Sequence, residues 1–283
     1  MSATKEAAIV RPEIRSRKTF SQQMRDFPWW GVLLVASILL AFVAMLQSEQ
    51  YRDALRFIVN PENTTEIGAG ILIKTGIRVT LLVTVVSYVM ALILGLILGV
   101  MRVSKNPILY HLSTLYVEVM RGVPMLVLIL WIGFVVVPGL RDATDGRFEL
   151  SRVQGGIIGL ALGYAAYLAE TYRAGIESIH KGQMEAARSL GMSYFEAMRY
   201  VILPQAIRRV VPPLANDFVA MLKDSALVSV VAVPEILQSA RLYVSRTFRA
   251  FEGYNSAALL YLILTLLFIF LVRYIEGRWH VDA

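Results

Sequence analysis

The strongest constraint on this chain is a series of six apolar blocks, each about as long as an α-helix needs to be to cross a bilayer. They cover roughly residues 29–46, 79–101, 123–137, 155–172, 210–233 and 256–272. Backbone groups in lipid must pair with one another, so a span is either a helix or part of a closed barrel. Continuous blocks of this length are typical of helices, whereas barrel strands alternate over about ten residues. The sequence therefore predicts an all-α polytopic membrane protein with about six transmembrane helices.

Composition supports this class. Hydrophobic residues make up 57% of the chain and charged residues 17%, whereas soluble domains carry about 25% charged residues. The net charge of +7 fits basic loops beside a membrane better than nucleic-acid binding, because no RNA- or DNA-binding motif accompanies it. The chain has no cysteine, and its three histidines are scattered. We therefore expect neither a metal site nor catalytic residues.

Lysine and arginine counts predict the orientation of the spans. Six spans place both termini on one side of the membrane. The tail, the 102–121 and 173–209 segments and the C-terminus together carry 17 Lys and Arg, against 8 on the opposite side. Basic residues concentrate in cytoplasmic loops. We therefore expect a multi-pass protein of the bacterial inner membrane, with both termini and the 173–209 loop in the cytoplasm.

The 173–209 loop contains signals for two short helices. Good helix formers occupy 183–190, and Gly191 suits the left-handed position after a helix end. Ser193 followed by Glu196 forms a capping box for a second helix, which Pro204 either ends or bends. Two capped helices would form a rigid elbow, suited to transmitting force from a soluble partner. The alternative is an amphipathic helix at the membrane interface, whose apolar side chains would touch lipid: Met198, Val201 and Ile202.

The same loop resembles a known signature. Residues Glu185, Ala186 and Ala187, then Gly191, then Leu203 and Pro204, have the spacing of the signature loop of binding-protein-dependent ABC importer permeases. Val201 stands where isoleucine is usual in that family, which is a conservative change.

Three further segments resemble the polar amino-acid branch of these permeases. Residues 121–124 are similar to its Arg-Gly-Thr-Pro motif, residues 166–175 to its fourth-span signature, and residues 222–235 to its fifth. The resemblance covers about residues 71–277. It implies a type I ABC importer permease with a five-helix core at 71–277, preceded by a cytoplasmic tail at 1–28 and an added span with a periplasmic segment at 29–70.

The resemblance also implies a division of labour. A cytoplasmic ABC ATPase dimer would bind ATP and contact the 176–206 loop, so the permease itself would carry no cofactor and would not be an enzyme. Other implied partners are a second permease copy or paralogue, a periplasmic or tethered amino-acid-binding protein, and membrane lipid, with no nucleic acid. The implied coupling residues are Glu185, Ala186, Ala187, Gly191 and Pro204.

Charges inside the spans suggest where substrate passes. Each charge at a helix centre costs about 2.5–3.5 kcal/mol on insertion scales, and Lys223 and Asp224 lie along the fifth block. Adjacent residues point in different directions on a helix, so each needs a partner elsewhere. Glu170 and Arg173, three apart, are expected to pair. The candidates for a substrate path or gate are Glu170, Lys223, Asp224 and Ser225.

Several alternatives remain open at this level. A structural charge network would explain the buried charges equally well. Ser225 and Ser229 are expected to share one face of a helix and line a polar route. An ion-coupled secondary transporter using Asp224 and Glu170 as proton sites is the rival function, although no clear internal repeat supports it. A membrane hydrolase is disfavoured, because no histidine–carboxylate cluster or nucleophile motif is present. The glycines spaced by four at 95–99 and 155–163 predict close packing within the chain rather than a dimer contact.

Overall fold

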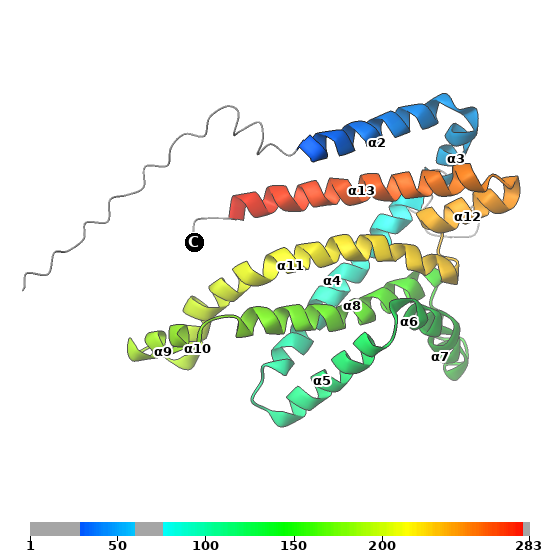
Figure 1. Ribbon diagram of the computed structural model, residues 1–283. Coiled ribbons are helices and arrows are strands. Elements are labelled where there is room, and N and C mark those ends of the chain that lie inside the picture. Colours follow the sequence, from blue (N-terminus) through cyan, green and yellow to red (C-terminus); the bar gives the residue numbers. More distant parts are fainter. Residues whose placement is uncertain (1–28, 60–75, 280–283) are drawn as a thin grey trace, which may run out of the picture. The chain divides into compact units, whose positions relative to one another are not determined.

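The computed structural model describes residues 29–59 and 76–279. Segments 1–28, 60–75 and 280–283, including the expected cytoplasmic tail, lie outside the described residues. Every regular element in the described ranges is a helix (Figure 1). The chain divides into two compact units, Met1–Met45, which holds most of helix α2 (Trp29–Gln47), and Leu46–Ala283.

The second unit contains spans built from single helices and from chains of shorter ones. Its first half consists of α3 (Glu49–Val59), α4 (Gly76–Arg102), α5 (Pro107–Gly122), α6 (Met125–Trp131), the π-helix η2 (Ile132–Val136) and α7 (Val137–Ala143). Its second half consists of α8 (Arg152–Glu177), α9 (Lys181–Ser189), α10 (Tyr194–Ala197), the π-helix η3 (Met198–Ile202), α11 (Leu203–Asp224), the 3-10 helix η4 (Ser225–Val231), α12 (Ile236–Thr247) and α13 (Ala250–Trp279).

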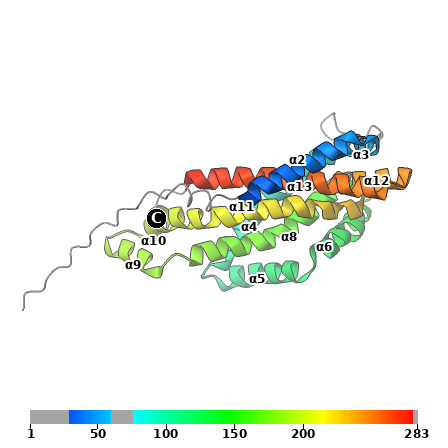
Figure 2. The same cartoon turned by 45° about the horizontal axis from the view of Figure 1, so that its top comes forward.

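The six apolar blocks all lie in helical structure, which confirms the all-α polytopic fold. By length and hydropathy alone, the helical stretches that could cross a membrane among the described residues are Gly76–Arg102, Met125–Ala143 and Ala250–Tyr274. In Figures 1 and 2, α8 and α11 run side by side. Helices α9 and α10 lie at one end of this pair, which we call the elbow end, and the turn between α12 and α13 lies at the other, the hairpin end.

The third span is longer and less regular than its apolar block. Segment 102–121, which the charge count treated as a loop, is largely helix α5. Asn106 begins this helix by accepting a hydrogen bond from the backbone N–H of Ile108 at 2.9 Å, with Pro107 at the first helical position. Pro124 then separates α5 from α6, because its ring cannot donate a backbone hydrogen bond. Hydropathy missed α5 because its charged and polar residues interrupt the apolar run.

The fifth span changes helix type at its end. Helix α11 stops at Asp224, and seven residues of 3-10 helix follow, closed by Ala232 with a left-handed φ of +59°. A 3-10 helix has three residues per turn, so positions four apart lie about 120° apart around it. The expected shared face of Ser225 and Ser229 is therefore wrong, because it assumed an α-helix.

Glycine allows α4 and α8 to pack closely. A Cβ added at Gly95 would lie 2.8 Å from Cβ of Leu168, and one at Gly99 would lie 2.8 Å from Cβ of Tyr172. Both distances are shorter than carbon atoms tolerate, so only glycine permits this approach. The predicted packing within the chain is confirmed for this helix pair.

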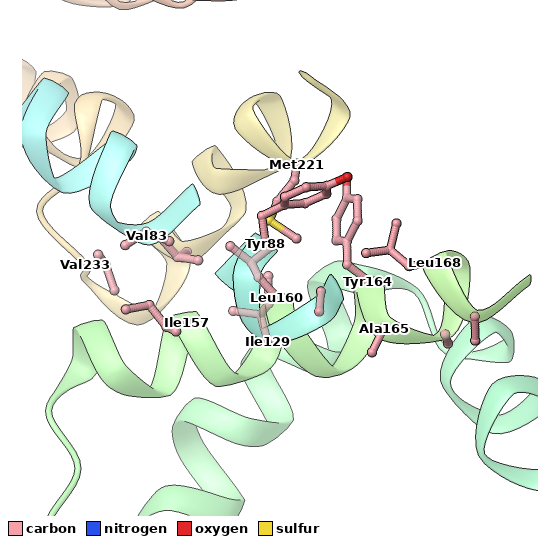
Figure 3. Close-up of a cluster of buried hydrophobic side chains, with 14 of the residues drawn as sticks. Val83, Tyr88, Ile129, Ile157, Leu160, Tyr164, Ala165, Leu168, Met221 and Val233 are labelled. Atoms are coloured by element: carbon pink, nitrogen blue, oxygen red, sulfur yellow. The ribbon is translucent and has the colours of Figure 1, made fainter. Parts of the chain in front are cut away.

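The core lies between α4, α6, α8 and the end of α11 with η4. Leu160 on α8 and Ile129 on α6 are completely buried, as is Met221 on α11. Figure 3 shows these side chains together with Tyr88 and Tyr164, whose rings also belong to the cluster. The core therefore holds α8 at the centre of the bundle.

Helix α3 packs on the hairpin end. The ring of Phe57 lies 5.7 Å from that of Tyr243 on α12, and the guanidinium of Arg246 lies 5.4 Å from the Phe57 ring. The side-chain amide of Asn255 on α13 donates to the hydroxyl of Tyr51 at 3.2 Å. On sequence grounds, α3 belongs to the added N-terminal segment. In the structure it is part of the same compact unit as the core.

Candidate functional site

The elbow, defined here as residues 180–203, has two capped helices as predicted. Helix α9 ends in a Schellman arrangement: the N–H of Met192 donates to the carbonyl of Ala187 at 3.2 Å, and that of Gly191 to Arg188 at 3.0 Å. Gly191 adopts a φ of +85°, the left-handed conformation that favours glycine. Helix α10 begins at the expected capping box between Ser193 and Glu196.

Pro204 does not end the helix. Helix α10 continues through the π-helix η3 into α11, and Pro204 occupies the first turn of α11. Proline has no backbone N–H to donate to the preceding helical turn. The wider π-turn before Pro204 does not require this hydrogen bond. The elbow is therefore continuous with the fifth span.

Several of the elbow's large apolar and aromatic side chains are exposed. Leu190 is 81% exposed and Phe195 is 72% exposed, and Tyr194 and Tyr200 are also mainly exposed. By contrast, Ile202 is buried against Ile179 in a small cluster that fixes the elbow to the end of α8. An exposed group of aromatic and aliphatic residues of this kind is typical of a protein-binding surface.

The signature residues of the elbow divide into buried and exposed positions. Ala187 is buried, whereas Ala186 and Glu185 are exposed on the same short helix. Pro204 is exposed at the start of α11. Glu185 accepts a hydrogen bond from the Ser189 hydroxyl through its backbone carbonyl, which leaves its carboxylate available.

Two carboxylates on α11 face hydroxyl groups on α8. The Tyr164 hydroxyl donates to Oδ2 of Asp224 at 2.7 Å, and the Thr171 hydroxyl donates to Oδ2 of Asp217 at 3.4 Å. Each pair is separated from the other by seven residues, or about two helical turns, along both helices. The antiparallel helices therefore present two acidic sites in a row, which could hold a cationic group such as an ammonium.

The other two predicted residues of the fifth span play different parts. Lys223 lies on the exposed side of α11 and makes no hydrogen bond or ion pair with any described residue. Ser225 is fully buried and donates to the carbonyl of Leu222 at 2.7 Å. As expected for neighbours on a helix, Lys223 and Asp224 do not pair with each other.

Glu170 belongs to an ion-pair network near the elbow end. It accepts from Arg102 on α4 at 2.8 Å and pairs with Arg173, as predicted from their spacing. Arg173 also pairs with Glu177, and Arg102 lies 3.9 Å from Glu118 on α5. This network ties three helices together through the partly buried side chains of Arg102, Glu170 and Arg173, with Glu118 and Glu177 on its exposed side.

Sequence reasoning missed Asp217, Tyr164 and Arg102. Asp217 could have been found, because it lies seven residues before Asp224 and so on the same helical face. Tyr164 reads as an ordinary core aromatic, and only the approach of α11 to α8 shows its role as a hydrogen-bond donor. Arg102 was counted as a loop charge, although its side chain is only 10% exposed.

Comparison with known proteins gives a consistent result. Residues 91–281 match the family described as "Binding-protein-dependent transport system inner membrane component". The chain is 42% identical over 179 residues to the probable glutamine ABC transporter permease protein GlnM of Bacillus subtilis (strain 168), covering 63% of this chain and 80% of that protein. It is 35% identical over 171 residues to the glutamine transport system permease protein GlnP of Escherichia coli (strain K12), covering 60% and 76%.

Two solved structures share the fold. The first is a crystal structure of an amino acid ABC transporter with histidines, with a TM-score of 0.66 and 38% identity over 72% of this chain and 92% of that chain. The second is an inward-facing conformation of the MetNI methionine ABC transporter, with a TM-score of 0.60 and 25% identity over 72% of this chain and 94% of that chain.

Proposed function

Because this chain belongs to the family of binding-protein-dependent transport system inner membrane components, we propose that it is the permease subunit of an ATP-driven amino-acid importer. Its relatives include permeases for glutamine and a structure of an amino acid transporter. The permease forms the path through the membrane. ATP is bound and hydrolysed by a separate cytoplasmic ATPase dimer, and a binding protein delivers the amino acid.

The observation that carries this proposal is the elbow. It presents exposed Leu190 and Phe195 at the end of a capped, glycine-closed helix, and it matches the permease signature in spacing. It continues through η3 into α11, which holds the Asp217 and Asp224 carboxylates. A movement of the ATPase would reach Asp217 and Asp224 through η3 and α11, which has Pro212 and Pro213 in its interior, and we assign this as the coupling route.

The acidic row supports an amino acid as the cargo. Every amino acid carries an ammonium group at neutral pH, and a carboxylate in a site of low dielectric attracts it more strongly than in water. Asp217 and Asp224 are both half-buried next to hydroxyl groups, so each can exchange its hydroxyl partner for a substrate ammonium. Glu170 lies nearer the elbow end, inside the ion-pair network, and serves as a gate residue there rather than as a binding group.

The test is reconstitution of the permease with its ATPase and binding protein in proteoliposomes. We expect ATP-dependent uptake of an amino acid, measured with a labelled panel and competing unlabelled amino acids. Uptake that needs a proton gradient and no ATPase would instead support the ion-coupled transporter that uses Asp224 and Glu170. A permease that never co-purifies with an ATPase would contradict the proposal at its first step.

A further inference from the structure

A pocket lined by polar and apolar residues lies near the hairpin end, apart from Asp217 and Asp224. It has a volume of about 360 Å³, within the range of about 300–1,000 Å³ found for small-molecule sites. The pocket is bounded by η4 and the turn after it on one side and by one face of α12 on the other. Its lining residues are Ser229, Val230, Ala232, Gln238, Arg241, Leu242 and Ser245.

Arg241 is the charged residue of this pocket. Its side chain makes no hydrogen bond or ion pair with any described residue. Glu235 attracts Arg241 without a hydrogen bond or ion pair between them, and the Glu235 carboxylate accepts from the N–H groups of Leu237 and Gln238. The guanidinium therefore keeps its donors available, and a planar fork of N–H groups matches a carboxylate.

Neutral polar groups surround this cation. Gln238 and Ser245 lie on the same face of α12 as Arg241, at spacings of three and four residues. Ser229 faces them from η4 and is almost fully buried. The pocket floor includes Ala232, whose left-handed φ of +59° is strained for a residue other than glycine. Strain of this kind is concentrated at functional sites, and here it holds the turn that shapes the pocket.

The pocket is connected to the acidic row through η4. Ser229 lies five residues after Asp224, which is about 10 Å along a 3-10 helix. An amino acid carries both charges on one carbon, so it would meet Arg241 on α12 first and Asp224 at the start of η4 second. We propose that this pocket is the entry site for the substrate's α-carboxylate, held by Arg241 with Gln238 and Ser229, before the ammonium reaches Asp224. The proposal rests on the amino-acid importer function.

The absence of cysteine from the chain allows a direct test. Ser245→Cys places a single thiol in the exposed part of the pocket. The variant is assembled with its ATPase and binding protein in proteoliposomes, and its labelling rate is measured with an anionic and a cationic thiol reagent. We expect Arg241→Gln to slow the anionic reagent about fivefold, the effect of one nearby charge in water. Arg249→Gln, which removes a charge outside the pocket, is the matched control and should leave the rate unchanged.

Protection identifies the ligand. Millimolar L-glutamine should slow labelling of Ser245→Cys, and the α-amide of glutamine should not. Arg241→Gln should abolish this protection, while Arg249→Gln should keep it. Equal protection by the amide, or protection that survives Arg241→Gln, would overturn the carboxylate site. If the labelling rate changes with the phosphatidylglycerol content of the vesicle and not with glutamine, the pocket binds a lipid phosphate. That result would also overturn the carboxylate site.

The same vesicles separate this inference from the proposed function. ATP-dependent uptake by the complex with unmodified Ser245 and Arg241 tests the importer itself. Uptake without any glutamine protection refutes the pocket alone. An assembled complex that takes up no amino acid refutes the importer, and with it the identity of the ligand. If the importer function and the carboxylate site are both correct, Arg241→Gln lowers uptake about tenfold, as loss of a charge-assisted hydrogen bond implies. Arg249→Gln then changes uptake less than about twofold.

Discussion

The hydroxyl of Tyr164 on α8 donates a hydrogen bond to Oδ2 of Asp224 at 2.7 Å, and so links the centre of the bundle to the last residue of α11. The partner of a membrane carboxylate determines whether the charge is structural or functional. A neutral hydroxyl donor satisfies one lone pair and leaves the negative charge uncompensated. Our proposal that Asp224 binds the substrate ammonium rests on this relationship, because a salt bridge would already compensate the charge.

Asp224→Asn should impair transport more than folding. Asparagine still accepts the Tyr164 hydrogen bond through its amide oxygen, so helix packing is kept, but the charge is lost. We expect uptake to fall about tenfold or more, since hydrogen bonds to charged groups contribute about 1.5–3 kcal/mol. Tyr164→Phe, which keeps the carboxylate, should cost less. Normal uptake by Asp224→Asn removes this residue from the substrate path, and failure to assemble assigns it to a structural network.

Gly191→Val should uncouple ATP hydrolysis from uptake while leaving the spans inserted. No atom lies within 4 Å of a Cβ added at Gly191, so the cost comes from the φ of +85° alone. That cost is about 1–2 kcal/mol for most residues and less for asparagine. Gly191→Asn is therefore the control and should behave nearly normally. The measurement is substrate-stimulated hydrolysis and uptake in one reconstituted complex. Unchanged coupling in Gly191→Val and Glu185→Ala would show that the elbow is not the ATPase contact.

Gly95→Ala should destabilise the bundle. The added methyl group would lie 2.8 Å from Cβ of Leu168, and that atom is fixed to the α8 backbone. Overpacking of this kind costs about 1–3 kcal/mol. Gly139→Ala on α7 is the control, because nothing lies within 4 Å of its added Cβ. Thermal unfolding in detergent should show a lower transition for the first variant only, and equal transitions would mean that α4 and α8 are not in close contact.

The start of α10 should loosen at acidic pH. The backbone N–H of Ser193 donates to the Glu196 carboxylate at 2.8 Å and holds the pKa of Glu196 below its ordinary value. A lowered pKa in the folded state means that the cap stabilises the helix above the ordinary glutamate pKa and loses this effect as the pH falls through the folded-state value.

Hydrogen exchange over residues 194–202, corrected for intrinsic rates, measures this effect. Exchange should accelerate on acidification in the unmodified chain. Glu196→Gln keeps an acceptor for the capping box and removes the titration, so its corrected exchange should not depend on pH. An equal response in both chains would rule out the carboxylate as the cause.

Topology is the simplest prediction to check. Cysteines introduced at positions 145 and 245 should react with impermeant reagents from the outer face, and cysteines near either terminus only from the cytoplasm. The charge count of 17 against 8 supports this orientation. Labelling of position 145 from the cytoplasm alone would invert the third span and contradict the assignment.

The sequence was sufficient where the local chemistry is strong. Gly191 and the pair Ser193–Glu196 specify helix ends through backbone geometry, so both features were predicted and are confirmed. The sequence was insufficient where contacts between helices determine the local structure or the partner of a side chain. The 3-10 conformation after Asp224 has no local signal, and the Tyr164–Asp224 pair depends on the packing of α11 against α8. Arg102 was misread for the same reason: its partner Glu170 is 68 residues away.

The seven residues of η4 span a greater length as a 3-10 helix than they would as an α-helix. A 3-10 helix rises about 2.0 Å per residue and an α-helix about 1.5 Å, so Ser225–Val231 spans about 14 Å where an α-helix would span about 10.5 Å. Conversion of this segment to α-helix would draw Ala232 and the start of α12 about 3.5 Å toward Asp224. The same conversion would rotate Ser229 relative to Ser225. A change in winding, with no hinge and no broken chain, is therefore enough to change the distance between the two ends of the substrate's proposed route.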